Sequence, residues 1–469
     1  MPPGLAYRQS RRAQTVAEWT RLKAEMDAWF ARGRDTDFRK RHGRQLRLLE
    51  TTLQGALDFL RKKIEGITLT QPTWDFYRAC RQHEERLLWV RALWQYFMPK
   101  FDQREDARFK SLLSAADEVV WASYAPAFEK LGQKPPPPPL PYIEPHFTPR
   151  AIPLDQPPAE LKQVDADFLK GFLERLPIAV IGLPPACVTA PWWLAHIAHE
   201  AGHHLQHELN LVVPFGKALA NASGGNGAAL PPGLAGSWSS WGEEIFADAH
   251  ALLTIGPSAP RALADVELSS PELTASRPKY PATVVRLGWQ RLALSRWNLD
   301  NEALGSEMDE KLRELTQAGQ LPGPTATAWS NIQRLADVVL AQRLPVDGGL
   351  TIEELNEWDA VPYEANAGIA QYANSMRSGT ILGEAQNTRT IRHLVAAGVK
   401  GWAGTLEVED PATREEEQKL LAAALVANLN QHGPPGDRAT RAAEPVQEEA
   451  FGEELGELLF EQAPAEMQP

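Results

Sequence analysis

Cysteine is nearly absent from this chain, because only Cys80 and Cys187 occur among its 469 residues. Two cysteines so far apart in the sequence form neither a closely spaced metal-binding doublet nor a framework of disulfides. Their scarcity fits a reducing compartment. We therefore expect a cytoplasmic protein.

An excess of basic charge is also lacking, since 48 lysines and arginines stand against 60 aspartates and glutamates, for a formal net charge of -12. A chain with this balance has no overall positive field to hold nucleic acid or an anionic membrane. We expect neither as a partner. The local basic patch at Arg8 to Arg12 is better explained as solvated surface.

Long apolar runs are missing as well. The N-terminal stretch has no apolar segment of the kind found in secretory signals. No uninterrupted run reaches the roughly 20 residues needed to cross a bilayer, and the nearest candidate, 176–194, is broken by four prolines. With 43% hydrophobic and 23% charged residues the composition is ordinary for a globular chain, so we expect a soluble folded protein.

What the sequence does contain is helical periodicity over most of its length. Apolar residues recur at three- and four-residue spacing from about 15 to 130, with breaks expected at 66–73 and 99–105. The run IAVIGL at 178–183 lies between prolines and predicts a strand. Further helices are expected at 165–175, 283–297, 302–318, 325–342, 364–378, 384–399 and 414–431. The predicted fold class is mainly α, of the α+β kind, with a short strand or small sheet.

Composition divides the chain into five regions. These are an N-terminal helical region (1–134), a proline-rich connector (135–160), a histidine-rich region (161–300), a C-terminal helical region (301–432) and an acidic tail (433–469). Prolines favour an extended, stiff connector, with a ligand for a proline-binding domain as the alternative. The tail is rich in Pro, Gly and Glu and is expected to be disordered. Either segment is a candidate contact for a protein partner.

Five of the chain's 11 histidines fall within 196–207, in the segment HIAHEAGHHLQH. Thr189 is expected to cap a helix here, with Pro191 in its first turn. His199 and His203 are four residues apart, so on a helix they share one face and can bind one ion. Glu200, beside them, can take the proton of a water that zinc acidifies.

The other three histidines suit this ion less well. His207 is eight residues beyond His199, about 12 Å along a helix axis, which is too far for a shared ion. His196 is similarly displaced from His203. We expect His196 and His207 to be structural or solvated residues on the metal-facing side, while His204 points elsewhere.

A third ligand is expected in the segment SSWGEEIFADAH at 239–250. Glu244 and Asp248 are four residues apart on one helical face, so Glu244 can complete the zinc shell while Asp248 holds a ligand histidine. Glu243 is the runner-up. Ser240 and Glu243 have the spacing of a capping box, which would occupy Glu243 at the start of a helix near Ser240.

The pairing of HEAGH with the downstream EIFAD resembles the gluzincin group of zinc metallopeptidases. The resemblance implies that His199 and His203 bind zinc and that Glu200 is the general base. It also implies that Glu244 is the third ligand and that Asp248 orients a histidine.

This resemblance covers roughly 178–256 and implies a zincin-like core within 161–300, in which an edge strand lies beside the active-site helix. Such enzymes also need a donor for the oxyanion that develops in the transition state. The candidates are Tyr280, which we place first, Arg286 and His250.

The sequence therefore predicts a soluble zinc metallopeptidase that binds one zinc ion and hydrolyses protein or peptide substrates, with Glu200 as the base. The alternative is a helical interaction or scaffold protein whose metal site is structural or catalytically silent. A third reading, metal buffering by histidines, predicts several weakly bound ions instead of one.

Overall fold

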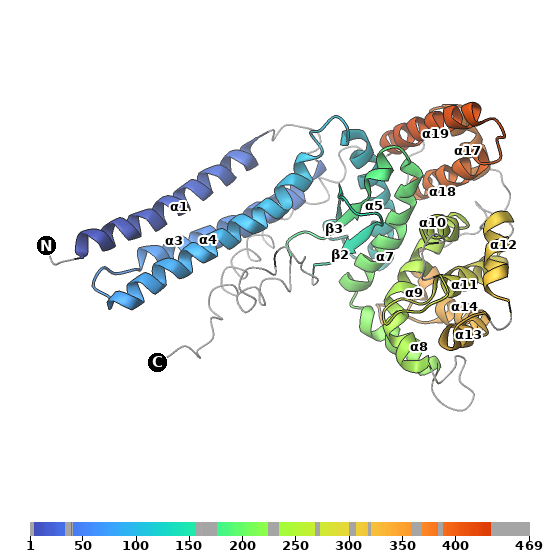
Figure 1. Ribbon diagram of the computed structural model, residues 1–469, viewed down its shortest axis with the longest axis horizontal. Coiled ribbons are helices and arrows are strands. Elements are labelled where there is room, and N and C mark those ends of the chain that lie inside the picture. Colours follow the sequence, from blue (N-terminus) through green and yellow to red (C-terminus); the bar gives the residue numbers. More distant parts are fainter. Residues whose placement is uncertain are drawn as a thin grey trace. The chain divides into compact units, whose positions relative to one another are not determined.

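The computed structural model describes residues 4–32, 39, 41–154, 161, 176–223, 234–267, 273–299, 306–317, 320–357, 368–382 and 388–432. These residues are mainly helical and include a small three-stranded sheet (Figure 1), which confirms the mainly α class. The helix expected at 165–175 and the acidic tail lie outside them. None of the helices within these ranges is both long and apolar enough to cross a membrane.

The chain divides into two compact units. The first contains Met1–Glu105, and the described residues of this range are helical. In it, α1 (Leu5–Ala31), α3 (Gly43–Glu65) and α4 (Thr73–Asp102) pack against one another. The expected break at 66–73 is confirmed. The second break, at 103–109, overlaps the predicted 99–105 but begins later, because α4 continues through Pro99, whose carbonyl still accepts a hydrogen bond from the Gln103 N–H at 3.1 Å.

The second unit contains Asp106–Ala151 and Val180–Pro434. Its α-helices are α5 (Lys110–Lys130), α7 (Ile197–Glu208), α8 (Val212–Ala222), α9 (Ala235–Ile255), α10 (Ser258–Glu267), α11 (Thr283–Ser295), α12 (Ser306–Leu315), α13 (Gly323–Trp329), α14 (Ile332–Ala341), α15 (Ile352–Leu355), α17 (Ile369–Arg377), α18 (Thr388–Thr405) and α19 (Pro411–His432). The single helix expected at 325–342 is thus two helices, α13 and α14. The chain turns between them at Asn331, whose side chain donates to the Thr327 carbonyl.

The sheet combines β1 (Leu140–Ile143), β2 (Arg150–Ile152) and β3 (Val180–Leu183) in the order β1-β3-β2. β3 confirms the strand expected at 178–183, and β1 pairs with it in parallel. β3 is the central strand of this sheet, and β1 and β2 are its edge strands. Both flanking strands come from the proline-rich stretch, and Pro141 is tolerated in β1 because a strand at the edge leaves one side unpaired.

The start of the histidine helix differs from the prediction. Thr189 does not cap it but ends a short 3₁₀ turn, η2 (Pro185–Val188), and its hydroxyl donates to the Ala186 carbonyl. A second 3₁₀ helix, η3 (Pro191–His196), follows with Pro191 at its first position, and α7 continues from it. The chain therefore enters α7 through two tight turns.

α7 and α9 lie side by side in the second unit (Figure 1). They meet at Gly202, where an added Cβ would come within 2.9 Å of the Ala247 Cα and 3.1 Å of the His250 Cβ. A side chain at residue 202 would therefore force the two helices apart. The glycine inside HEAGH fixes how closely the histidine helix approaches the glutamate helix.

Candidate metal centre

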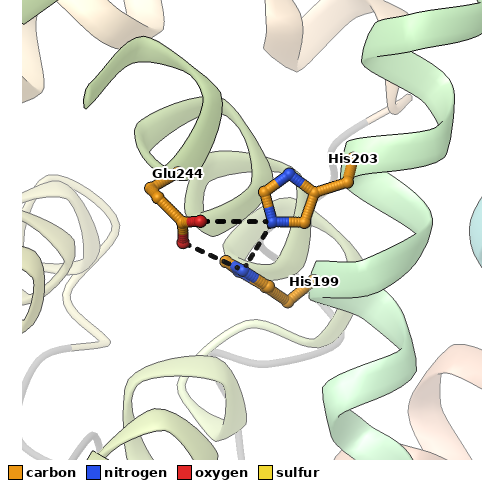
Figure 2. Close-up of side chains that lie close together, drawn as sticks. All are labelled: His199, His203 and Glu244. Atoms are coloured by element: carbon orange, nitrogen blue, oxygen red, sulfur yellow. Dashed lines mark hydrogen bonds and ion pairs between the residues drawn. The ribbon is translucent and has the colours of Figure 1, made fainter. Parts of the chain in front are cut away.

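His199 and His203 on α7 face Glu244 on α9 (Figure 2). The two histidine Nε2 atoms are 3.1 Å apart. The Glu244 carboxylate places Oε2 at 3.4 Å from His199 Nε2 and Oε1 at 3.6 Å from His203 Nε2. The structure thus brings together the three residues that the sequence selected as ligands.

The donor atoms of the three residues are close enough to share one metal ion. Ligand atoms about 2.0–2.1 Å from a tetrahedral zinc ion, for example, lie about 3.3–3.4 Å from one another. The two histidine nitrogens are 3.1 Å apart, and they lie 3.4 and 3.6 Å from the two different oxygens of Glu244. Two imidazoles and one carboxylate thus form a group that can hold a metal ion.

Glu244 is charged and available as a ligand. Burial raises the pKa of its carboxyl, but His203, His199 and Arg286 outweigh burial and lower the pKa to about 2. The side chain is only 7% exposed. A buried carboxylate surrounded by these donors is suited to offset the charge of a cation.

Asp248 contacts Nδ1 of His199, whereas Glu244 lies near Nε2 of the same ring. Its Oδ1 is 3.1 Å from His199 Nδ1, and Arg286 donates to both of its oxygens, at 2.6 and 2.8 Å. In the neutral form of His199, a hydrogen bond from Nδ1–H to the carboxylate leaves the lone pair of Nε2 free for an ion. Asp248 therefore occupies the supporting position expected from its spacing.

Glu243 is occupied by another partner. Its Oε1 lies 3.1 Å from His207 Nε2 and 4.0 Å from His203 Nδ1. The capping box expected for Ser240 is wrong, because α9 begins at Ala235 and the Ser240 hydroxyl instead donates to carbonyls within the helix. Burial of Trp238 and Trp241 favours this earlier start. Glu243 therefore contacts His207 and does not cap the helix.

Glu200 is buried beside the ligands and receives a hydrogen bond from the backbone N–H of Ala151 in β2. Burial raises the pKa of its carboxyl to about 7, although the charge of His199 opposes the rise. A carboxylate with a pKa near neutrality can both accept and return a proton.

An ion pair fixes the strand that supplies this N–H. Arg150 of β2 donates from Nε and Nη2 to the buried Glu144 carboxylate, at 2.5 and 2.7 Å, and the Tyr142 hydroxyl donates to the same group at 2.6 Å. Gly182 in β3 leaves the room for Glu144 that a Cβ would fill. Arg150 precedes Ala151 directly, so the pair holds the backbone that contacts Glu200.

Four other histidines near the cluster are buried or half-buried, namely His196, His204, His207 and His250. His204 hydrogen-bonds the Val180 carbonyl at 3.2 Å and so faces the sheet, as its position on the helix predicts. Burial lowers the pKa of His196 to about 3, and the nearby charges of His199 and Arg286 add to this effect. His250 is fully buried against Gly202, out of reach of a substrate.

The two other oxyanion candidates differ in access. Arg286 is only 4% exposed and its guanidinium is committed to Asp248, with Glu244 3.4 Å away. Tyr280 is 37% exposed, and the charge of Glu244 raises the pKa of its hydroxyl. Of the two, Tyr280 is the more exposed to solvent.

Sequence reasoning missed the contributions of Glu144, Arg150 and Ala151. Nothing in the sequence near these residues signals contact with a helix about fifty positions later. Comparisons with protein-family models, with curated proteins and with solved structures found no match.

Proposed function

We propose that this protein is a zinc-dependent peptidase whose active site is the His199, His203 and Glu244 cluster. The observation that carries the proposal is the close spacing of the donor atoms, 3.1 Å between the two histidine nitrogens and 3.4 and 3.6 Å from them to the Glu244 carboxylate, with the buried Glu200 next to His199 in the sequence. Two nitrogens and one carboxylate oxygen with an open fourth corner are typical of catalytic rather than structural zinc sites.

A zinc ion in this position supplies positive charge that polarises a carbonyl and acidifies water. The chain supplies the rest of the chemistry. Glu200 accepts the proton of the attacking water and returns it to the leaving amine. The Ala151 N–H holds the Glu200 carboxylate in place, and Asp248 fixes the tautomer of His199. Tyr280 is our candidate donor to the developing oxyanion.

The substrates are peptide bonds of proteins or peptides. This choice follows from the resemblance of HEAGH and EIFAD to gluzincins. A silent metal site would not need a buried carboxylate beside the ligands.

Glu200→Gln tests the function directly. The protein and the variant are purified, their zinc content is measured, and each is incubated with a cell lysate whose new peptide termini are identified by mass spectrometry. We expect one zinc per chain in both proteins and new termini only with wild type. Glu208→Gln, a glutamate at the far end of α7, is the matched control and should cleave like wild type. Equal cleavage by Glu200→Gln would contradict the proposal.

A further inference from the structure

Three aromatic side chains form a chain of ring contacts at the start of α7, the helix that carries His199 and His203. His196 lies three residues before His199 and four before Glu200, so its ring shares their side of the helix. The Trp193 ring meets His196 edge-on with centroids 5.6 Å apart, and Phe147 meets Trp193 in the same way at 5.9 Å. We name His196, Trp193 and Phe147 the aromatic ledge.

The outer end of the aromatic ledge faces solvent. Phe147 lies in the connection between β1 and β2 and is 67% exposed, whereas Trp193 is half-buried. The preceding residue, Trp192, behaves differently, because it is buried and stacks on Trp402. One tryptophan of this pair thus belongs to the core, and the other supports an exposed aromatic ring. Aromatic rings contribute large apolar contact area when they are covered by a ligand.

The aromatic ledge is also uncharged at its surface. The Trp193 indole hydrogen-bonds the Asp265 carboxylate on α10, which satisfies the only polar atom of its side chain. The remaining ring faces of Trp193 and Phe147 are carbon. Such a surface binds apolar side chains and disfavours charged ones, which would lose hydration without gaining a partner.

We propose that the aromatic ledge is the subsite for a large apolar side chain, such as Phe or Leu, of a peptide substrate close to the bond that is cleaved. This inference rests on the proposed peptidase function. The two ring-to-ring steps from His196 to Phe147 together are shorter than about four extended residues at about 3.3–3.6 Å each. His196 itself precedes the candidate ligand His199 by three residues, about one helical turn. We therefore expect the preferred residue within a few positions of the cleaved bond.

A mixture of ten-residue peptides with randomised sequences tests this subsite when cleavage positions and rates are read by mass spectrometry. For wild type we expect Phe and Leu to be preferred over Ala by about ten-fold in kcat/KM at one position near the cleaved bond. Phe147→Ser should reduce that ratio to about three-fold or less. Ile381→Ser, which also removes an exposed apolar side chain but lies outside the aromatic ledge, should keep the wild-type ratio.

Binding separates this inference from the proposed function. The Glu200→Gln protein is titrated by calorimetry with two uncleaved peptides that differ only by Phe or Ala, with and without Phe147→Ser. Tighter binding of the Phe peptide that is lost in Phe147→Ser supports the subsite even if wild type cleaves nothing. Equal binding of the two peptides, or cleavage whose apolar preference persists in Phe147→Ser, overturns the subsite and leaves the peptidase proposal standing.

Discussion

Arg286 binds Asp248 through two hydrogen bonds, from Nε to Oδ2 at 2.8 Å and from Nη2 to Oδ1 at 2.6 Å. Both side chains are buried, and Asp248 also contacts His199 Nδ1. One carboxylate thus links a permanent cation to a candidate metal ligand. A substitution of Asp248 should therefore affect ion binding through His199 and stability through Arg286.

Asp248→Asn should weaken zinc binding by about 10- to 100-fold, because the amide no longer holds the His199 ring as a charged acceptor. Competition with a coloured zinc chelator measures the affinity. Asp309→Asn is the matched control, since Asp309 pairs with Arg291 at 2.9 Å in the same unit without touching the ligand cluster. Equal affinities of wild type and Asp248→Asn would show that Asp248 does not support His199.

Arg286→Met should reduce the free energy of unfolding by about 3–5 kcal/mol, because it leaves the buried carboxylates of Asp248 and Glu244 without their cation. Urea unfolding of the metal-free protein, with a chelator present, provides the measurement. A loss below about 1 kcal/mol would mean that the two carboxylates are balanced by another group.

His203→Ala and His207→Ala form a matched pair on one helix. Removing His203 takes away a donor atom that lies 3.6 Å from Glu244, so bound zinc should fall from one ion per chain to near zero after dialysis. Removing His207 breaks only its contact with Glu243. Elemental analysis should therefore find zinc retained in His207→Ala, and equal loss in both variants would place the ion elsewhere along α7.

Glu144→Gln tests the support of Glu200 through β2. The neutral amide cannot accept both charged hydrogen bonds from Arg150, so Ala151 shifts and its N–H releases Glu200. We expect kcat to fall by about ten-fold while zinc content stays at wild-type level. Asp106→Asn, which weakens an exposed pair with Arg108, should leave kcat unchanged because such surface pairs contribute little.

His83 should make the first unit sensitive to acid. Burial, with the charges of Arg86 and Lys63, lowers the pKa of this histidine from 6.5 to about 4. Its neutral form is favoured in the folded state, so its contribution to stability is complete above pH 6.5 and is lost as the pH falls toward 4. Urea midpoints measured across this range should fall, and less steeply in His83→Leu. An identical slope in the variant would assign the acid sensitivity to other groups.

Local spacing predicted the part of the site that depends on local geometry. His199 with His203, and Glu244 with Asp248, are each four residues apart on a helix, and the structure brings the two helices together. The remainder depends on packing between distant segments. α9 begins at Ala235 because Trp238 and Trp241 are buried, which removed the expected cap at Ser240.

The strands β1 and β2 could not be predicted from the sequence for a related reason. Prolines and turn residues in 135–154 carry no alternating pattern, and pairing with β3 creates these strands only when the chain is folded. Contacts such as Ala151 with Glu200 arise from that pairing. Such contacts leave no periodic signal in either segment.

The absence of a side chain at Gly202 affects the size of the ion that the three donor residues can hold. Two of the three donor atoms belong to α7 and the third to α9, so the distance between these helices sets the radius of the space among them. That distance is limited by the contact of Gly202 with the Ala247 backbone. A single methyl group, in Gly202→Ala, would widen the space, and the site would then discriminate less well against cations larger than zinc, such as Mn²⁺ or Ca²⁺. Gly202 would thereby limit the size of the ion that the site can bind.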